Sequence, residues 1–409
     1  MTFDLDLDFV RAQFPAFSQD SLKDQAFFEN AGGSYTCRQV IDRLTRFYMQ
    51  RKVQPYSAYG ASRLGGEEMD EARERLAAMM GAAPEDISFG PSTTQNVYVL
   101  AQAFGQMLGE GDAIIVTNQD HEANTGAWRR LAARGIDVRE WRIDPETGHL
   151  PIETLINLLD EKVKLVCFPH CSNIVAEINP VKEICKIIKA AGAYSCIDGV
   201  GYAAHGFPNI PDLGADIYMF SAYKTYGPHQ GIMYVNAALA EALPNQGHHF
   251  NGSILSKRFT PAGPDHAQIA ACAGMVDYFD ALYAHHIGGN AEALTRNDAV
   301  HGLMRRQEIK CLQPLLDYLS EKNSVRLLGP NIAEKRAPTV AMVLQSHGGE
   351  TAAKLADKGI MCSGGSFYSQ RVLEGQNANV DRGVLRLSFV HYTSEADVQR
   401  LIRELDAVI

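Results

Sequence analysis

The chain has 409 residues, of which 46% are hydrophobic and 21% are charged, the composition of an ordinary globular protein. Its net charge of -10 argues against a nucleic-acid partner, since proteins that bind nucleic acid usually carry a basic surface. No apolar run approaches the roughly 18 residues that a membrane helix requires. Residues 1–6 are acidic and lack a basic segment followed by an apolar one, so we expect no signal peptide and a cytoplasmic protein.

The first two thirds of the chain alternate strand and helix patterns after an expected amphipathic helix over residues 6–14. Short apolar runs predict strands at residues 112–117, 164–169 and 215–220, and residues 138–143, 193–197 and 231–235 are further strand candidates. Helices are predicted at residues 126–133 and 151–159, and from Pro180 with Asn179 as its N-cap. Strands separated by helices of about 10–15 residues indicate a mostly parallel sheet covered by helices on both faces.

The pattern changes beyond about residue 290 to helices and shorter strands. Strands are expected at residues 340–344 and 384–389, and a last helix follows Ser394, which forms a capping box with Asp397. The fold class is therefore α/β with a second, smaller α+β domain. We expect the large domain to span residues 60–290 and the smaller one to combine residues 1–59 with 291–409.

Lys224 follows the apolar strand 215–220 and lies just before the turn Gly227-Pro228. For a lone lysine, the ordinary explanation is a side chain that reaches water. An amine at a strand end can also condense with an aldehyde, as pyridoxal phosphate (PLP) chemistry requires, together with a carboxylate for the pyridine nitrogen. Asp198 lies 26 residues before Lys224, at the end of the strand 193–197, and offers that carboxylate.

Two further polar residues follow predicted strands. His121 could stack on the cofactor ring, and Asn173 could donate a hydrogen bond to its phenolate oxygen. Each is a weak signal alone, and Asp198 with Gly199 could be a simple turn. Because open α/β sheets bind ligands at the carboxyl ends of their strands, we expect these side chains to meet Lys224 there.

A phosphate site is predicted at residues 90–96, Gly-Pro-Ser-Thr-Thr-Gln-Asn, which precede an apolar helix. Backbone N–H groups at a helix N-terminus and the hydroxyls of Thr93 and Thr94 could bind phosphate. An ordinary Ser/Thr N-cap is the alternative. Ser221, three residues before Lys224, could add a hydroxyl to the same phosphate.

The eight cysteines lack even spacing, which indicates reduced thiols rather than a disulfide scaffold. Cys167, His170 and Cys171 could be drawn as a metal site. No second Cys/His pair at ligand spacing follows them, so we expect no metal.

Seven segments, in family order, resemble the class V aminotransferase family of fold-type I PLP enzymes, and within it the branch that is similar to cysteine desulfurases and isopenicillin-N-epimerases. These segments are residues 28–33, 92–96, 120–124, 172–180, 198–199, 221–231 and 386–392. The resemblance implies a homodimer with its active site near the interface, PLP as cofactor and a small amino acid as substrate.

The resemblance also implies roles for individual residues. Lys224 would form the Schiff base, Asp198 would face the pyridine nitrogen and His121 would stack on the ring. The other expected cofactor contacts are Thr93, Thr94, Asn173, Ser221 and Tyr223. Arg386 and Asn30 would bind the substrate, and a guanidinium fork suits a carboxylate.

The chain departs from the family pattern at several positions. Tyr223 stands where the family commonly has His before the lysine. Gly201 stands where relatives have Gln or His, so one cofactor contact is absent or comes from elsewhere, for example from His205. Desulfurases carry a cysteine that accepts sulfur as a persulfide; Tyr368 falls at that position, and Cys362 lies six residues earlier.

These observations predict a PLP enzyme that acts at the α-carbon of a small amino acid. A lyase that eliminates a β-substituent of the C–S type, without a persulfide cysteine, is slightly favoured, and a transaminase and an epimerase are the alternatives in the same family. A non-catalytic binding protein with the same fold is disfavoured because every residue that the cofactor needs is present. A nicotinamide enzyme is disfavoured because no G-x-G-x-x-G follows a strand.

Overall fold

A computed structural model describes residues 4–409, so part of the acidic start used above lies outside the described residues. Within this range, seven strands form a large sheet in the order β2-β8-β7-β6-β5-β3-β4. The strands are β2 (Ile87–Gly90), β3 (Ala113–Thr117), β4 (Asp137–Trp141), β5 (Val163–Pro169), β6 (Tyr194–Asp198), β7 (Ile217–Ser221) and β8 (Gly231–Val235). Neighbouring strands from β4 to β7 pair in parallel, and β8 pairs antiparallel with both β2 and β7. The expected mostly parallel sheet is confirmed.

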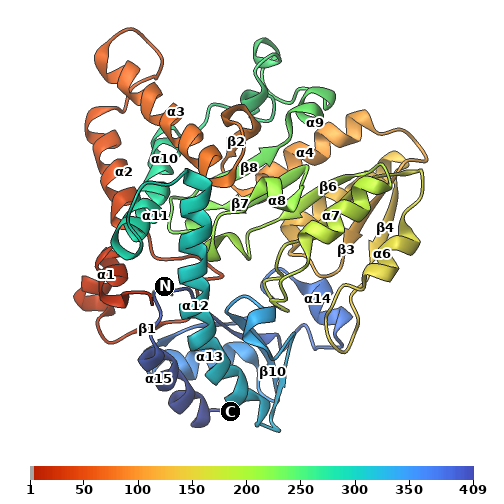
Figure 1. Cartoon of the computed structure of the whole chain (residues 1–409). Coiled ribbons are helices and arrows are strands. Elements are labelled where there is room, and N and C mark those ends of the chain that lie inside the picture. The colour runs from red at the N-terminus through yellow and green to blue at the C-terminus, as the bar shows by residue number, and fades with distance from the viewer. Residues whose placement is uncertain (1–3) are drawn as a thin grey trace.

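Helices pack on both faces of this sheet (Figure 1). They are α4 (Thr93–Met107), α5 (Gly126–Arg129), α6 (Ile152–Leu158), α7 (Val181–Ala190), α8 (Ile210–Leu213), α9 (Ala237–Ala242), α10 (His266–Ala271) and α11 (Ala273–His286). Two apolar clusters hold the layers together: Val97 and Trp128 belong to one, and Phe168 and Ile184 to the other. The helix predicted over residues 126–133 is shorter, because α5 gives way to a 3-10 turn over Arg130–Arg134.

The predicted start of α7 is wrong by one position. Pro180, not Asn179, is the N-cap residue, and the helix begins at Val181. The Asn179 side chain turns inward instead and donates to Gln119 Oε1 at 2.7 Å and to the Pro169 carbonyl at 2.8 Å. A buried amide with two partners in the sheet is better satisfied there than at a helix end.

A second sheet of four antiparallel strands lies in the lower part of Figure 1, in the order β12-β13-β10-β9. Its strands are β9 (Val325–Leu327), β10 (Thr339–Leu344), β12 (Ser363–Gly365) and β13 (Val384–Ser388). Three helices belong to this part: α13 (Gly348–Ala356), α14 (Gln370–Gly375) and α15 (Glu395–Asp406). The capping box of Ser394 and Asp397 at the start of α15 is confirmed.

The two ends of the chain meet in this region. The short strand β1 (Ala26–Phe27) pairs in parallel with β11 (Ile360–Met361). The helix α12 (Ala293–Ser320) packs against α3 (Gly60–Met80) and α11, and also against α15. The division into a domain of residues 60–290 and a second domain of residues 1–59 with 291–409 stays a prediction. The helix α2 (Arg38–Gln50), which that prediction assigns to the smaller domain, packs on α10 and α11 of the larger one.

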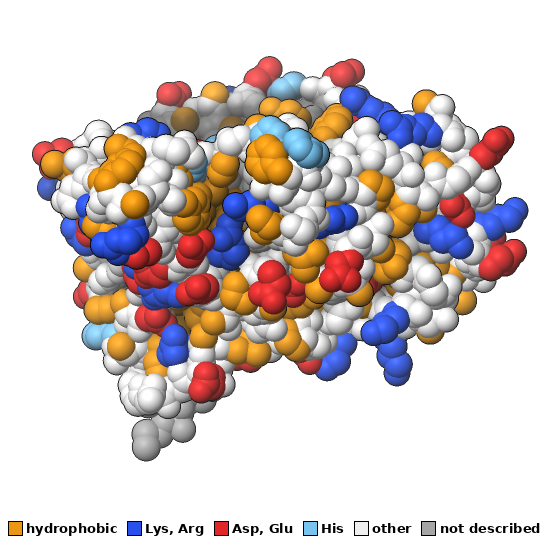
Figure 2. Space-filling view, turned by 90° about the horizontal axis from the view of Figure 1, so that it is seen from above, with side chains coloured by type: hydrophobic (Ala, Val, Ile, Leu, Met, Phe, Trp, Pro, Cys, Tyr) orange, Lys and Arg blue, Asp and Glu red, His pale blue; other side chains and the backbone are white. Residues whose placement is uncertain are grey.

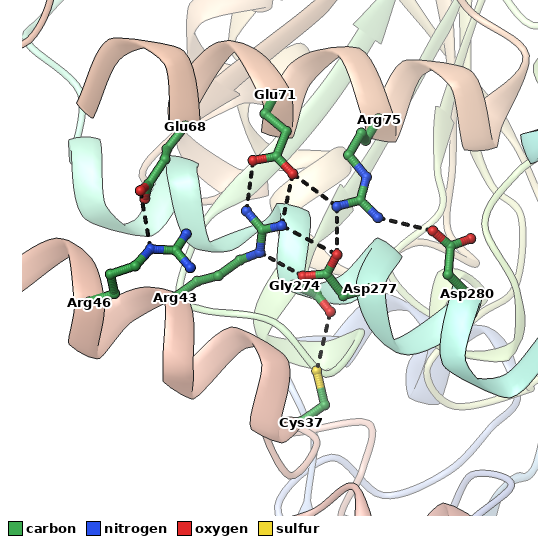
Figure 3. A network of polar contacts seen from close by, with 9 residues as sticks. All are labelled: Cys37, Arg43, Arg46, Glu68, Glu71, Arg75, Gly274, Asp277 and Asp280. Carbon is green, nitrogen blue, oxygen red and sulfur yellow. Dashed lines mark hydrogen bonds and ion pairs between the residues drawn. The ribbon is translucent and has the colours of Figure 1, made fainter. Parts of the chain in front are cut away.

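A network of ion pairs joins α2 to α3 and α11 (Figure 3). Arg43 binds both carboxylate oxygens of Glu71, at 2.8 and 2.9 Å, and Asp277 at 2.6 Å. Arg75 binds the same Asp277 and also Asp280 at 3.0 Å. The hydrogen bond from Arg43 lowers the pKa of Glu71 to about 2. A partly buried network of bidentate pairs orients the helices more firmly than isolated surface pairs do.

The segment 34–37, which leads into α2, lies across the turn that contains Lys224 and is held there by backbone hydrogen bonds. The Ser34 N–H donates to the Tyr223 carbonyl at 3.0 Å, and the Cys37 N–H donates to the Tyr226 carbonyl at 3.1 Å. Cys37 is buried, and its thiol faces the carbonyl of Gly274 at 3.7 Å (Figure 3). The N-terminal segment is therefore anchored beside the predicted site.

The face shown in Figure 2 has Lys and Arg side chains interspersed with Asp and Glu and with hydrophobic side chains. Charges of both signs alternate over short distances on that face. None of the helices within residues 4–409 is long and apolar enough to cross a membrane.

Candidate active site

A cavity of about 570 Å³ opens at the carboxyl ends of β3, β5, β6 and β7. The N-terminal segment and the second sheet contribute the rest of its wall. All residues predicted for the site line it: Asn30, Thr93, Thr94, His121, Asn173, Asp198, Ser221, Tyr223, Lys224 and Arg386. The structure thus brings together side chains from segments that lie up to 356 residues apart. His121, Asn173, Asp198 and Lys224 meet as expected for residues that follow parallel strands of one sheet.

Lys224 ends a 3-10 turn, Ala222–Lys224, that follows β7 directly. Tyr226, two residues on, has φ of 64°, which residues other than glycine rarely adopt. Its buried hydroxyl donates to the Ala204 carbonyl, and its N–H donates to Ser34 Oγ at 2.8 Å, so this turn is held on both sides. Burial and the nearby Arg386 lower the pKa of the Lys224 amine to about 8. The uncharged, nucleophilic fraction of this amine is therefore larger near neutral pH than that of an ordinary lysine.

Two hydroxyls meet at the N-terminus of α4. Thr93 Oγ1 lies 2.8 Å from Ser221 Oγ, and Ser92 caps the helix by accepting from the Gln95 N–H. Gly231 makes this approach possible, because a Cβ at that position would lie 2.5 Å from the Ser92 carbonyl carbon. Hydroxyls and N–H groups at a helix N-terminus form a site for an anion such as phosphate.

Asp198 closes β6, and its Oδ1 accepts from the Val200 N–H at 2.8 Å. Burial raises the pKa of this carboxyl, although the Val200 N–H and the Lys224 amine oppose the shift. Asp120 lies in the same cavity wall, and burial together with the charge of Asp198 raises its pKa well above the usual value. Two buried carboxyls that interact in this way favour one ionised and one protonated group. Asp120 belongs to the segment 120–124 that carries the family resemblance, but its interaction with Asp198 was not predicted from the sequence.

His121 is neutral in this setting, because burial and the charges of Lys224 and Arg386 lower its pKa to about 3. Its Nδ1 accepts from the Ala123 N–H at 3.0 Å, which fixes the ring. Asn173 donates to the Phe367 carbonyl at 3.1 Å and accepts from Ser369 Oγ at 2.7 Å. Asn173 therefore lies in the wall as expected, and one of its tasks is to hold the loop 367–369.

Arg386 is 3% exposed and lies in the strand β13. Its Nη2 donates to Glu29 Oε1 at 2.7 Å, and its guanidinium carbon lies 3.8 Å from the centre of the Phe367 ring. Asn30 is buried, accepts from the Tyr392 hydroxyl and donates to the Ser388 carbonyl at 3.3 Å. The partners Glu29 and Phe367 were not predicted, because neither forms a recognisable pattern with Arg386 in the sequence.

Gly201 approaches the backbone so closely that a Cβ there would contact the Cys171 carbonyl oxygen. A Gln or His at this position would therefore displace the loop after β5. His205 lines the same wall and its Nδ1 lies 2.7 Å from Glu308 Oε1 on α12, a carboxylate with no exposed surface. Whether His205 supplies the missing contact stays a prediction.

Two thiols lie in this region: that of Cys171 is buried in the cavity wall, and that of Cys362 is half-buried outside it. Burial raises the pKa of Cys171 and of Cys362 to about 12. Cys171 donates to the Ala176 carbonyl at 3.1 Å, and Cys362 separates β11 from β12.

Tyr368, at the position where desulfurases carry their cysteine, is 76% exposed, and its ring lies 5.5 Å from that of His121. His170 is taken up by stacking on Tyr202 and by a 2.9 Å contact with the Tyr218 hydroxyl.

The donors around the cavity fit a PLP molecule. The hydroxyls and the N-terminus of α4 match a phosphate dianion. The buried carboxylate of Asp198 matches a pyridinium nitrogen, because the positive charge of that nitrogen would return the pKa of Asp198 toward its usual range. The amine of Lys224 matches an aldehyde, and the neutral ring of His121 matches a flat aromatic face. Fold and cavity together define a fold-type I PLP enzyme.

Comparison with known proteins gives the family. A family model described as aminotransferase class-V matches residues 26–401. An aminotransferase-like protein, FGM3, of Gibberella zeae is 32% identical, with 98% of each chain covered. A cysteine desulfurase of Serratia proteamaculans is 28% identical over 98% of this chain and 97% of that protein. The apo structure of a cysteine desulfurase from Thermococcus onnurineus NA1 shares the fold, with a TM-score of 0.85, 24% identity and 100% and 99% of the two chains covered.

This chain belongs to the class V aminotransferase family, and it is a PLP-dependent enzyme of the cysteine-desulfurase-like branch. The sequence-based expectations of family, fold and cofactor are confirmed. The roles of the individual site residues stay predictions.

Proposed function

We propose that this protein is a lyase that removes a β-substituent of the C–S type from a small amino acid without passing sulfur to a cysteine of its own. The distribution of thiols carries this proposal. Cys171 is the one cysteine in the cavity wall formed by the described residues, and its raised pKa keeps it a thiol rather than a thiolate. Only a thiolate attacks sulfur readily, so direct elimination fits this site better than persulfide formation.

Several residues would support elimination. When bound, PLP supplies an electron sink for negative charge at the α-carbon. The Lys224 amine, with its pKa near 8, would take the α-proton and Arg386 would orient the α-carboxylate. Asp198 would hold a positive charge on the ring nitrogen, and the neutral His121 would pack on the ring.

The names of the relatives support a sulfur-containing amino acid as substrate, since several are cysteine desulfurases. A transaminase is the second candidate, because the relative at 32% identity is named aminotransferase-like. Incubation with L-cysteine separates the two. A lyase releases sulfide and ammonia without a keto-acid acceptor, whereas a transaminase releases neither and needs the acceptor for repeated turnover.

Replacing Cys362 with Ala is expected to change the rate of sulfide release by less than about twofold, because a half-buried thiol with a raised pKa that lies outside the cavity wall contributes no nucleophile. Sulfide is measured in single-turnover and steady-state reactions, and intact mass is recorded during turnover. A loss of several orders of magnitude, or the mass of one added sulfur atom on Cys362, would contradict elimination.

We also propose a homodimer with its active site near the interface. Large hydrophobic side chains are exposed from the end of α2 to the start of α3: Tyr48, Met49, Tyr56 and Tyr59, with exposed fractions of 51–77%. Tyr and Met are enriched at protein interfaces. Light scattering after size-exclusion chromatography is expected to give twice the mass of one chain, and Met49→Asp is expected to increase the monomer fraction. A monomeric parent protein would refute the dimer.

A further inference from the structure

The ion pair between Arg386 and Glu29 is incomplete. Arg386 Nη2 donates to Glu29 Oε1 at 2.7 Å, and both residues line the cavity. Arg386 Nε and Glu29 Oε2 are both buried, and neither has a hydrogen-bond partner within the described part of the chain. A buried guanidinium and a buried carboxylate normally satisfy each other in a bidentate pair. The pair is therefore held by a single hydrogen bond, and the Glu29 side chain, 22% exposed, keeps part of its surface on the cavity.

The surroundings hold this arrangement in place. The Phe367 ring lies flat against the guanidinium, whose carbon is 3.8 Å from the ring centre. The carboxylate of Glu29 occupies space that exists because residue 32 has no side chain. A Cβ at Gly32 would lie 2.7 Å from Glu29 Oε1. The packing of the cavity wall therefore fixes the position of the Glu29 carboxylate beside the guanidinium of Arg386.

We infer that Glu29 is a specificity-determining residue, which disfavours amino acids with a second carboxylate. The inference rests on the proposed function, in which Arg386 takes the α-carboxylate of the substrate. A second carboxylate would then lie near the charge of Glu29, and like charges in a water-poor site repel strongly.

Binding is measured before turnover, as the rapid change in absorbance of the PLP-loaded protein on mixing with L-serine, L-alanine or L-aspartate. The parent is expected to bind aspartate at least about tenfold more weakly than alanine, and serine, which is also neutral, about as well as alanine. Glu29→Gln keeps the size of the side chain and removes its charge. This variant is expected to reduce the discrimination against aspartate by about tenfold.

Glu122→Gln is the matched control. Its carboxylate also lines the cavity, but it is 53% exposed and faces Arg371 at 3.6 Å rather than Arg386. The control is expected to keep the ratios of the parent. If Glu29→Gln does not fold, Gly32→Ala displaces the carboxylate without changing the charge of the chain, and it is expected to shift the same ratio.

Two outcomes in Glu29→Gln would overturn the inference alone. The first is an unchanged ratio of aspartate binding to alanine binding. The second is tighter binding of all three amino acids by the same factor, which would show that Glu29 only competes with the α-carboxylate for Arg386. A parent protein whose absorbance responds to none of the three would refute the proposed function itself, and the inference would fall with it.

Discussion

Borohydride reduction of the PLP-loaded protein, followed by peptide mapping, is expected to place the pyridoxyl group on Lys224. Replacing Lys224 with Ala is expected to lower turnover by about 10²–10⁴-fold, the usual contribution of a proton-transferring group. The reason is that Lys224 ends a rigid turn inside the cavity and its amine has a pKa near 8. Lys182→Ala is the control, because Lys182 is 70% exposed and pairs with Asp212 on the surface. An adduct on another lysine would refute the assignment.

The same amine sets a pH dependence for cofactor loading. Burial lowers the pKa of Lys224 to about 8, so the uncharged, nucleophilic form increases as the pH rises through that value. Covalent loading of the cofactor-free protein is therefore expected to accelerate between about pH 7 and pH 9 and then level off. The rate is followed by absorbance. A rate that continues to rise toward pH 10.5 would show a lysine with the ordinary pKa.

The sequence predicts every strand of the large sheet except the edge strand β2. The strands β3 and β5 to β8 are mostly apolar and buried, the edge strand β4 alternates apolar and charged residues, and each appears within about three residues of its predicted position. The strand β2 was missed because Ile87–Gly90 is only four residues long and leads directly into the turn before α4. Its pairing with β8 is a contact across more than 140 residues, which no local pattern reveals.

Residues of the candidate site were predictable where chemistry and chain position coincide. Lys224 and Asp198 each follow an apolar strand, so their meeting at one edge of the sheet follows from topology. The pairing of Glu29 with Arg386 does not, because it depends on how the N-terminal segment pairs beside the end of the strand β13. The same is true of Asn173, whose amide binds the loop 367–369.

Asp198→Asn is expected to slow exchange of the α-proton about a hundredfold, or about 2.7 kcal/mol in barrier, while cofactor content stays close to that of the parent. The amide has the same shape, so its oxygen can still accept from the Val200 N–H and the turn after β6 is kept. It carries no negative charge, however, and cannot favour a protonated ring nitrogen. The proposed phosphate contacts at Thr93 and Ser221 and the proposed attachment at Lys224 would hold the cofactor without this charge.

Exchange is measured as incorporation of deuterium at the α-carbon of L-alanine by NMR, with cofactor content read from absorbance. Asp120→Asn is the matched control, since Asp120 is a second buried carboxyl of the same cavity whose pKa is raised well above its usual range. Because burial and the charge of Asp198 favour the protonated form of Asp120, replacing it by an amide removes less charge than the same change at Asp198, and exchange is expected to stay within about tenfold of the parent. Equal exchange rates in Asp198→Asn and the parent would exclude the role of Asp198, and a larger loss in Asp120→Asn would transfer that role to Asp120.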